Sequence, residues 1–534
     1  MEAAKTNHTQ NTQEDKNISK DKNTSTRVKE TFTEEIVLGI CSQIGSKKKL
    51  VLDEIENYLK EFDYSVQKIK LSDFFESEIQ KKHIQNGKTE NFSKLAQKIE
   101  TGNNLRNENG TDYLANLAIT KIASQKKNKF SVTGEEDITN IKSQRICYII
   151  DSIKHMDELN TFKDIYKDIF YLMSIYTPKE ERVTNLSIPN LSQKEAEDLI
   201  DKDQHEEIPN GQQVREVFVN ADFFFRVDKN TESEVKNKVK RYINLIFGSD
   251  IETPTIEERA MYEAKSASVN SACLSRQVGA SIICKEGSLI STGWNDVPKF
   301  GGNLYTCESK NDKRCFVLGY CSNDNNKLDL MNYITNEFKN KLDLNKIFPT
   351  ETKIEPDKNF VVKENLATFI KDILEDSGIK SLIEFSRSVH AEMHAIINAG
   401  HLNGNKIKGG TLFCTTYPCH NCARHIIAAG IEKVYYIEPY IKSKAPQLHD
   451  DSITEKENIK NKVQLLVFDG VSPRRYLTFF NQNRERKKSG KSLFKNIKKK
   501  DLSPINNISL QALFYLETQA AKRITDRKEN ETKA

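Results

Sequence analysis

Four residues in the last third of the chain have the types and spacing of a catalytic zinc site: His390, Glu392, Cys419 and Cys422. Zinc takes histidine nitrogen and cysteine sulfur in a tetrahedral arrangement, and three protein ligands leave the fourth position for water, as in catalytic sites. Glu392 follows the histidine by two residues and is suited to move a proton from that water to a substrate. The pattern predicts Zn²⁺ as the cofactor, three ligands (His390, Cys419, Cys422) and Glu392 as the catalytic residue.

Two predicted helices must position these side chains. One follows His390 and ends near Gly400, and the other runs from Cys419 to Gly430. The three ligands therefore fall near helix N-termini, where the backbone dipoles favour a thiolate. Two alternatives are a structural zinc site and a redox pair of Cys419 and Cys422, but neither needs a glutamate beside the histidine.

The order His-x-Glu, then Pro-Cys-x-x-Cys, is the signature of zinc nucleobase deaminases, and residues 254–480 resemble the cytidine and deoxycytidylate deaminase family. Within it, the chain is most similar to bacterial deoxycytidylate deaminase-like proteins that carry an N-terminal P-loop kinase-like domain and are implicated in anti-phage defence. The matching segments are 274–280, 292–298, 390–392, 415–424 and 437–443, with looser matches at 102–106 and 211–215.

This resemblance implies roles for three further residues. Ser275 and Arg276 are expected near the substrate phosphate, and Asn295 is expected to contact the sugar and orient the base. From the residues alone, Arg276 could equally form a surface ion pair, and Asn295 could be a turn residue. Two other histidines, His394 and His420, are predicted to be packing or surface residues rather than ligands.

The resemblance also implies an activity: zinc-dependent hydrolysis of deoxycytidine nucleotides, dCTP or dCMP, to deoxyuridine nucleotides and ammonia. In anti-phage defence this would deplete the nucleotide pool. Two alternatives stay open. One is a deaminase acting on cytosine or adenine in single-stranded DNA or RNA, and the other is a non-catalytic module that senses nucleotides. Related deaminases commonly assemble, so a homo-oligomer is expected.

Alternation of helical and strand patterns predicts an α/β fold: an N-terminal P-loop-like domain with a parallel sheet, then an α/β/α deaminase domain with a mixed sheet. Buried-strand patterns occur at 36–40, 65–69 and 146–151. The predicted organisation is a disordered lead-in (1–33), a kinase-like domain (34–250), a deaminase domain (254–480) with a polar insertion at about 298–348, and a basic tail with a C-terminal helix (481–534).

A glycine-containing segment after the first strand predicts a degenerate phosphate-binding loop. Its candidate residues are Gly39, Gly45, Ser46 and Lys47, which follow a strand and precede a helix. Five residues rather than four separate the glycines, and Gly-Ser-Lys replaces the usual Gly-Lys-Ser. A nucleotide effector is therefore a better expectation than phosphoryl transfer, and the alternative is a turn that has lost binding.

Three cysteines of the insertion, Cys307, Cys315 and Cys321, could bind a second metal, but no Cys-x-x-Cys unit is present and scattered thiols are favoured. Ten cysteines in 534 residues do not form a disulfide scaffold. The absence of a long apolar stretch or a hydrophobic leader predicts a cytoplasmic protein without a membrane span.

The charge of the chain is uneven. Residues 484–500 carry a net +8, which leaves −3 for the rest of a chain whose total is +5. Such a run is usually a solvated, flexible segment, and the alternative is a contact with RNA or an acidic partner.

Overall fold

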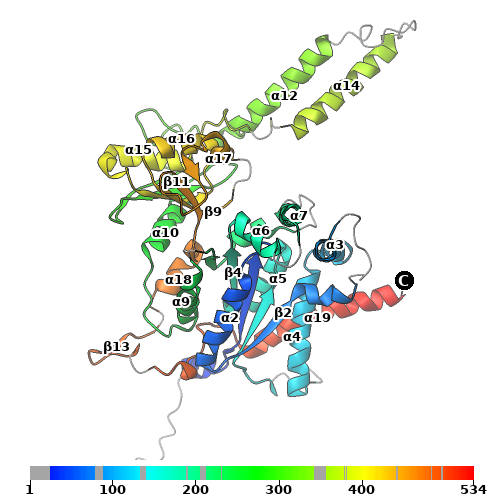
Figure 1. Cartoon of the computed structure of the whole chain (residues 1–534), viewed down its shortest axis with the longest axis vertical. Helices are drawn as coiled ribbons and strands as arrows, with labels where there is room; N and C mark the ends of the chain where they lie inside the picture. The colour runs from blue at the N-terminus through cyan, green and yellow to red at the C-terminus, as the bar shows by residue number, and fades with distance from the viewer. Residues whose placement is uncertain are drawn as a thin grey trace, which may run out of the picture. The chain divides into compact units, whose positions relative to one another are not determined.

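The computed structural model describes residues 24–78, 88–132, 140–187, 191–204, 212–229, 231–341, 356–377, 379, 382–439, 443–482, 484–494 and 497–533. The chain forms two compact units (Figure 1). Unit 1 consists of Met1–Phe218, Glu232–Ile251 and Gln482–Ala534, and unit 2 consists of Val219–Thr231 and Glu252–Asn481. The first 23 residues of the predicted lead-in lie outside the described residues. The rest of it is ordered, because Thr24–Lys29 forms helix α1 and Thr33 is buried.

The centre of unit 1 is a parallel sheet in the order β4-β1-β3-β2. Its strands are β4 (Phe170–Tyr176), β1 (Ile36–Ser42), β3 (Ile146–Asp151) and β2 (Ser65–Lys70). Strand β1 is buried along its whole length, as expected when helices cover both faces of a parallel sheet. The helices between residues 24 and 247, besides α1, are α2 (Lys48–Leu59), α3 (Glu90–Asn109), α4 (Tyr113–Phe130), α5 (Met156–Tyr166), α6 (Lys179–Ser187), α7 (Gln193–Gln204), α8 (Val214–Val219) and α9 (Val235–Phe247).

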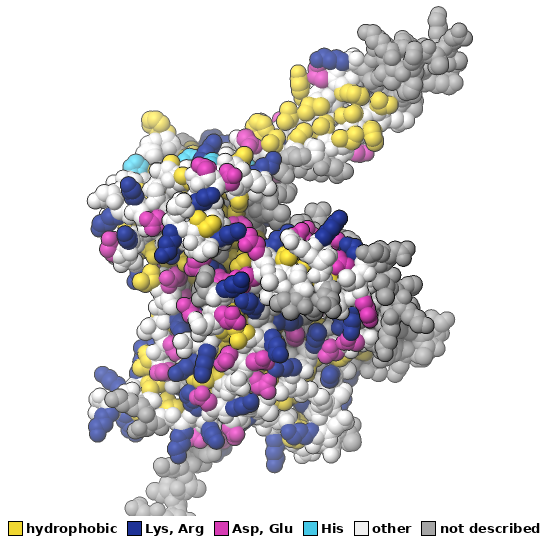
Figure 2. Space-filling view, viewed as in Figure 1, with side chains coloured by type: hydrophobic (Ala, Val, Ile, Leu, Met, Phe, Trp, Pro, Cys, Tyr) yellow, Lys and Arg dark blue, Asp and Glu magenta, His cyan; other side chains and the backbone are white. Residues whose placement is uncertain are grey.

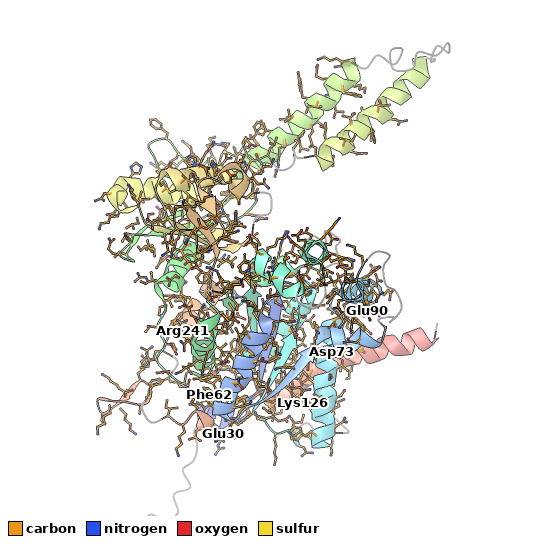
Figure 3. The ribbon with its side chains drawn as sticks, in the orientation of Figure 1. Glu30, Phe62, Asp73, Glu90, Lys126 and Arg241 are labelled. Atoms are coloured by element: carbon orange, nitrogen blue, oxygen red, sulfur yellow. The ribbon has the colours of Figure 1, made fainter. Side chains whose placement is uncertain are left out.

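The C-terminal segment, for which the sequence predicts a basic tail with a C-terminal helix, is part of unit 1. Helix α19 (Leu510–Lys533) packs on α4, and both Leu513 and Phe514 are buried. Between the two helices, the Lys126 ammonium (Figure 3) lies 2.8 Å from Glu517 Oε1 and 2.5 Å from Glu35 Oε2. All three side chains are at most 1% exposed. Such a buried charge cluster binds α19 into the domain.

Unit 2 contains a six-stranded mixed sheet in the order β10-β11-β9-β8-β6-β7, which confirms the prediction of a mixed α/β fold. Strands β10 (Ile453–Thr454), β11 (Val463–Val467), β9 (Lys433–Glu438) and β8 (Thr411–Thr416) are parallel. Strands β6 (Gly279–Ile283) and β7 (Leu289–Trp294) complete the sheet in antiparallel pairing. Strand β5 (Phe223–Arg226) pairs with β12 (Gly470–Val471) in antiparallel orientation.

Three helices pack closely around this sheet or beside it: α10 (Ile256–Ser268), α15 (Ala391–Asn403) and α16 (His420–Ala428). Helix α10 begins at a capping box, in which Thr255 accepts a hydrogen bond from Glu258 N and the Glu258 side chain returns to Thr255 N. Two short helices, α17 (Ala445–Leu448) and α18 (Tyr476–Phe480), follow later in the unit.

The insertion is longer and more helical than its polar sequence predicts. It forms α11 (Cys315–Leu318), α12 (Ser322–Lys341) and α14 (Pro356–Asp376), and the last two pack against each other (Figure 1). Figure 2 shows apolar side chains gathered along this helix pair. Among the described residues, no helix is both long and apolar enough to cross a membrane.

Candidate active site

The three predicted ligands converge at the N-termini of two helices in unit 2. His390 is the N-cap of α15, Cys419 is the N-cap of α16, and Cys422 lies in the first turn of α16. His390 Nδ1 lies 3.4 Å from Cys419 Sγ and 3.3 Å from Cys422 Sγ, and the three donor atoms all lie within 4.8 Å of one another. Tetrahedral zinc with ordinary bond lengths separates its donors by about 3.5 Å. The donor set therefore fits zinc in both chemistry and spacing.

The electrostatics of the site also suit a metal. A hydrogen bond from Cys422 and the nearby His390 ring lower the pKa of Cys419 to about 4. Burial by itself lowers the pKa of His390, but its interaction with Cys419 outweighs burial and raises it to about 9. Cys419 therefore presents the thiolate that a zinc ion requires.

Glu392 lies in the first turn of α15, two residues after His390, and is only 4% exposed. Burial, and secondarily the neighbouring Cys419, raise the pKa of its carboxyl group. A carboxyl with a raised pKa can both accept and return a proton near neutral pH, which is the property a general acid–base residue needs.

A cavity of about 430 Å³ opens in front of these residues. It is lined by His390, Glu392 and Cys419, together with the residues predicted from the resemblance, Ser275, Arg276 and Asn295. Six of the seven residues predicted for the deaminase site therefore line one cavity, and Cys422 lies directly behind it, 3.3 Å from His390 Nδ1. The cavity lies within the size range of small-molecule ligand pockets.

Asn295 fixes a loop of the cavity wall. Its Oδ1 accepts a hydrogen bond from Val278 N at 2.7 Å, and its Nδ2 donates to Arg276 O at 2.9 Å. Arg276 itself forms an ion pair with Glu438, at 2.6 Å, and is half exposed. In the structure both residues therefore have protein partners, as the alternatives from sequence allowed, and contact with a substrate stays a prediction for each.

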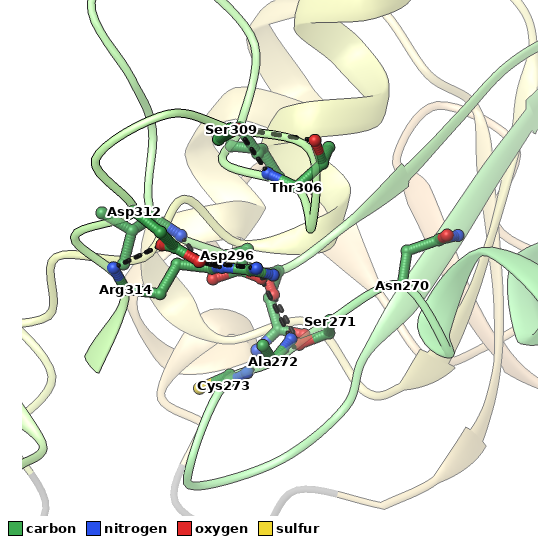
Figure 4. Close-up of polar contacts among 12 residues, drawn as sticks. Asn270, Ser271, Ala272, Cys273, Asp296, Thr306, Ser309, Asp312 and Arg314 are labelled. Carbon is green, nitrogen blue, oxygen red and sulfur yellow. Dashed lines mark hydrogen bonds and ion pairs between the residues drawn. The ribbon is translucent and has the colours of Figure 1, made fainter. Parts of the chain in front are cut away.

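Asp296 and Arg314 are positioning residues that the sequence analysis did not identify (Figure 4). The buried Asp296 carboxylate accepts hydrogen bonds from Ala272 N and Val297 N, and it lies 3.5 Å from the Arg314 guanidinium. Asp312 also pairs with Arg314, at 2.7 Å. The network holds the loop before Ser275, the residue after Asn295 and the insertion together. Asp296 directly follows a predicted site residue, but its partners could not be inferred from sequence spacing.

His394 has the packing role predicted for it. It is buried, its Nδ1 accepts a hydrogen bond from Trp294 N, and its Nε2 lies 3.1 Å from Asn398 Nδ2 and from Asn303 Oδ1. Burial lowers the pKa of this ring, which favours its neutral form. The ring holds the end of β7 through its hydrogen bond with Trp294 N.

The insertion cysteines do not gather into a second metal site. Within the described residues, His390, Cys419 and Cys422 form the only histidine, cysteine or acidic group close enough to share an ion. Cys315 and Cys321 instead line the cavity, whereas Cys307 is exposed. Scattered thiols are therefore the better description of these three residues.

The phosphate loop predicted in unit 1 is shorter than expected, because the first part of the predicted segment belongs to strand β1. Strand β1 continues to Ser42, and Gly39 lies within it, where a Cβ atom would come within 2.7 Å of both Ile153 and Phe170. Gly39 therefore makes room for packing and does not belong to the loop. Gly45 does belong to it, since it has a φ of +80° and a Cβ there would meet Arg182 O at 2.8 Å.

The loop borders a cavity of about 220 Å³ that is rich in cations. Gly45, Ser46 and Lys48 line it, and the Lys48 ammonium lies 2.7 Å from Asp151 at the end of β3. The side chain of Lys47 instead pairs with Glu181 at 3.0 Å. The other cationic side chains of the lining are Lys70, Lys98, Arg106 and Lys154.

Comparison with known proteins places the second unit in a family context. Residues 254–438 match the family described as the cytidine and deoxycytidylate deaminase zinc-binding region. The deoxycytidylate deaminase of Enterobacteria phage T2 is 31% identical over 177 residues, which cover 33% of this chain and 77% of the phage protein. The corresponding enzyme of phage T4 is 29% identical over 183 residues, with 33% and 75% covered.

A solved structure is also similar: the dCMP deaminase of cyanophage S-TIM5 in complex with dCMP and dUMP. It shares 21% identity with this chain, and the similarity covers 40% of this chain and 98% of the cyanophage protein, with a TM-score of 0.21.

Proposed function

Because the chain belongs to the cytidine and deoxycytidylate deaminase family, we propose that unit 2 hydrolyses deoxycytidine nucleotides to deoxyuridine nucleotides and ammonia. The observation that carries this proposal is the buried Glu392 carboxyl, which lines one cavity with His390 and Cys419, two members of the His390, Cys419 and Cys422 donor set. The relatives from phages T2 and T4 are named as deoxycytidylate deaminases, which supports dCMP as a substrate. The dCTP activity rests on the resemblance set out from the sequence.

The residues divide the reaction between them. His390, Cys419 and Cys422 would hold Zn²⁺, which when bound lowers the pKa of water enough to make it a nucleophile at neutral pH. Glu392 takes a proton from the attacking water and passes it to ring nitrogen N3 of cytosine, then helps protonate the departing amino group. The C4–N bond breaks, oxygen from water replaces the amino group, and ammonia leaves.

One experiment separates this function from its alternatives. The purified, zinc-containing protein is offered dCMP, dCTP, deoxycytidine, single-stranded DNA and RNA, and ammonia release is measured beside the Glu392→Ala variant. Release from free nucleotides that falls by at least about 10²-fold in the variant supports the proposal. Release from polynucleotides alone would favour the nucleic-acid deaminase, and no release from any substrate would favour the sensing module.

Unit 1 is proposed to be a degenerate P-loop-like domain that binds a nucleotide effector. Its parallel order β4-β1-β3-β2 places the loop after β1 at the carboxyl edge of the sheet, where α/β domains bind ligands. The buried hydroxyls of Ser46 and Ser72 have no hydrogen-bond partner and lie in the wall of the cation-rich cavity. Cations and unpartnered hydroxyl groups together suit phosphate oxygens.

Two neighbouring lysines provide a matched test of the effector site. ATP and dATP are expected to raise the melting temperature of the full chain, and Lys48→Met should remove this ligand-induced shift because Lys48 lines the cavity. Lys47→Met should retain the shift because Lys47 is paired with Glu181 outside the cavity. Equal shifts in both variants would contradict the placement of the site.

The proposed biological role rests on the resemblance set out from the sequence. We extend the proposal to anti-phage defence through depletion of cytosine deoxynucleotides, and phage plating on cells carrying wild-type or Glu392→Ala protein tests it. An unchanged plating efficiency between the two would argue against that role. A homo-oligomeric state and a cytoplasmic location stay predictions.

A further inference from the structure

The insertion supplies one wall of the deaminase cavity. Cys321, Ser322, Asp324 and Lys327, at the start of α12, line the same cavity as Glu392. Residues 382–388, which follow the insertion helices, contribute Leu382, Ile383, Ser386, Arg387 and Ser388. The insertion is therefore part of the binding site and not only an appendage of the sheet.

Several contacts fix this wall. Asn323 Nδ2 donates to Leu382 O at 3.0 Å, which joins the two ends of the helix pair. Val389 N donates to Asp296 O at 2.9 Å, and Arg387 Nη1 donates to Lys313 O at 3.0 Å. Through Asp296, the wall is connected to the same network that holds the loop before Ser275. A wall held at both ends can present its side chains at defined positions.

The wall is cationic. Lys327 has a side chain only 13% exposed, and its ammonium lies 2.7 Å from the exposed Asp324 carboxylate. The hydrogen bond from Lys327 lowers the pKa of Asp324, so the Asp324 carboxyl group is ionised at neutral pH. An ammonium has three donors and a guanidinium has five, and both Lys327 and Arg387 line the cavity. With Arg276, three cations line the cavity.

We propose that Lys327 and Arg387 bind the outer phosphates of a deoxycytidine triphosphate, beyond the inner phosphate expected at Ser275 and Arg276. This assignment rests on the proposed function and deepens it, because it names the triphosphate as the preferred substrate class. A monophosphate needs one anion subsite, which the Ser275 loop can supply. Additional cations on a second wall suit a ligand that carries further phosphate groups.

The test compares dCTP with dCMP in four variants, three at Lys327 and Arg387 and one control at Lys341. For Lys327→Met and for Arg387→Met, the ratio of kcat/KM for dCTP to that for dCMP should fall about 10- to 100-fold. The loss should appear mainly as a higher KM for dCTP, since the phosphates lie away from the reacting carbon. Lys327→Arg should restore part of the ratio. Lys341→Met is the matched control, since Lys341 lies on α12 outside the cavity and is 79% exposed.

Binding measured without turnover separates this inference from the function on which it rests. Calorimetric titration of the Glu392→Ala protein should show tighter binding of dCTP than of dCMP, and adding Lys327→Met should remove the difference. An unchanged ratio in both lysine and arginine variants, or equal losses for the two nucleotides, would overturn the inference while ammonia release still supported a deaminase. Absence of ammonia release from either nucleotide would instead contradict the proposed function.

Discussion

At the residue scale, metal binding depends on two sulfur atoms and one nitrogen atom brought together from segments about thirty residues apart. Cys419 and Cys422 come from one helical turn, so their spacing is fixed by local geometry, whereas His390 arrives from a separate helix. Loss of any one ligand leaves two donors, fewer than the three protein ligands that hold zinc in catalytic sites.

Replacing Cys422 by serine should therefore release zinc. The expected zinc content falls from about one ion per chain to well below half, because a serine hydroxyl is a poor zinc ligand. Metal analysis of the purified protein measures this. Cys307→Ser is the control, since Cys307 is exposed and lies outside the cavity, and it should keep its zinc. Full zinc content in Cys422→Ser would remove Cys422 from the ligand set.

The zinc ligands and Glu392 could be predicted from sequence alone, because their function depends on short motifs. Zinc ligands and the adjacent glutamate have few substitutes, so their order and spacing are informative. The role of Asn295 was less accessible, because its amide bonds two backbone groups of a loop that begins about twenty residues earlier in the chain. Asp296 and Arg314 were missed for the same reason, since an ion pair between buried side chains leaves no local pattern.

At the scale of elements, the contact between α4 and α19 depends on an unbalanced charge cluster. One cation, Lys126, faces two carboxylates, Glu35 and Glu517, and all three are buried. Burial, and the second carboxylate, raise the pKa of Glu517 to about 7, although Lys126 opposes this shift. The same two carboxylates raise the pKa of Lys126 against the effect of burial.

This cluster makes stability depend on pH in a definite direction. Between the ordinary pKa of a glutamate, about 4.5, and about 7, the unfolded chain has lost the Glu517 proton while the folded chain keeps it. The folded protein is therefore destabilised as pH rises through this window. Glu517→Gln has no proton to lose, so its melting temperature relative to wild type should rise by several degrees from pH 5 to pH 8.

Thermal melts at pH 5, 6, 7 and 8 measure this difference. Glu61→Gln is a suitable control because Glu61 is half exposed and pairs with Lys499 at the surface. Its difference from wild type should be small at every pH. A pH-independent difference for Glu517→Gln would show that Glu517 is ionised throughout the range.

At the scale of the whole molecule, the sequence predicts two α/β domains, each formed by one continuous segment of the chain. The structure instead assigns residues 219–231 to unit 2 and residues 482–534 to unit 1. Composition and periodicity describe neighbours along the chain, whereas Lys126 meets Glu517 across 391 positions. The assignment of these two segments therefore depends on contacts that no local pattern encodes.

The basic run at residues 484–500 also makes contacts with distant segments that its sequence pattern does not show. Lys499 donates to Glu61 and lies over the Tyr58 ring, and Arg484 donates to Ser503 O, so both ends of the run are attached to unit 1. Between them, Lys487–Lys488 and Lys491–Ser492 form an exposed two-stranded hairpin. A contact with RNA or an acidic partner stays a proposal, and this hairpin is where its charges are accessible.

Removal of residues 510–533 should destabilise unit 1 rather than shorten a tail. The deletion exposes the face of α4 that Leu513 and Phe514 cover, and it takes one of the two carboxylates from Lys126. Exposure of this much apolar surface is expected to lower the melting temperature by more than about 10 °C. If the truncated chain fails to fold, Phe514→Ala gives a milder test, with an expected cost of about 3–5 kcal/mol.

Neutralising the hairpin provides the contrasting case. Alanine at Lys487, Lys488 and Lys491 removes exposed charge without touching the core, so the melting temperature should stay within about 2 °C of wild type. The same variant should lose RNA binding in a filter assay if the hairpin carries that contact.

The deletion of residues 510–533 has its own contradicting outcome. If the chain without these residues melted like wild type, α19 would be an appendage, and the buried cluster at Lys126 would contribute nothing to the stability of unit 1.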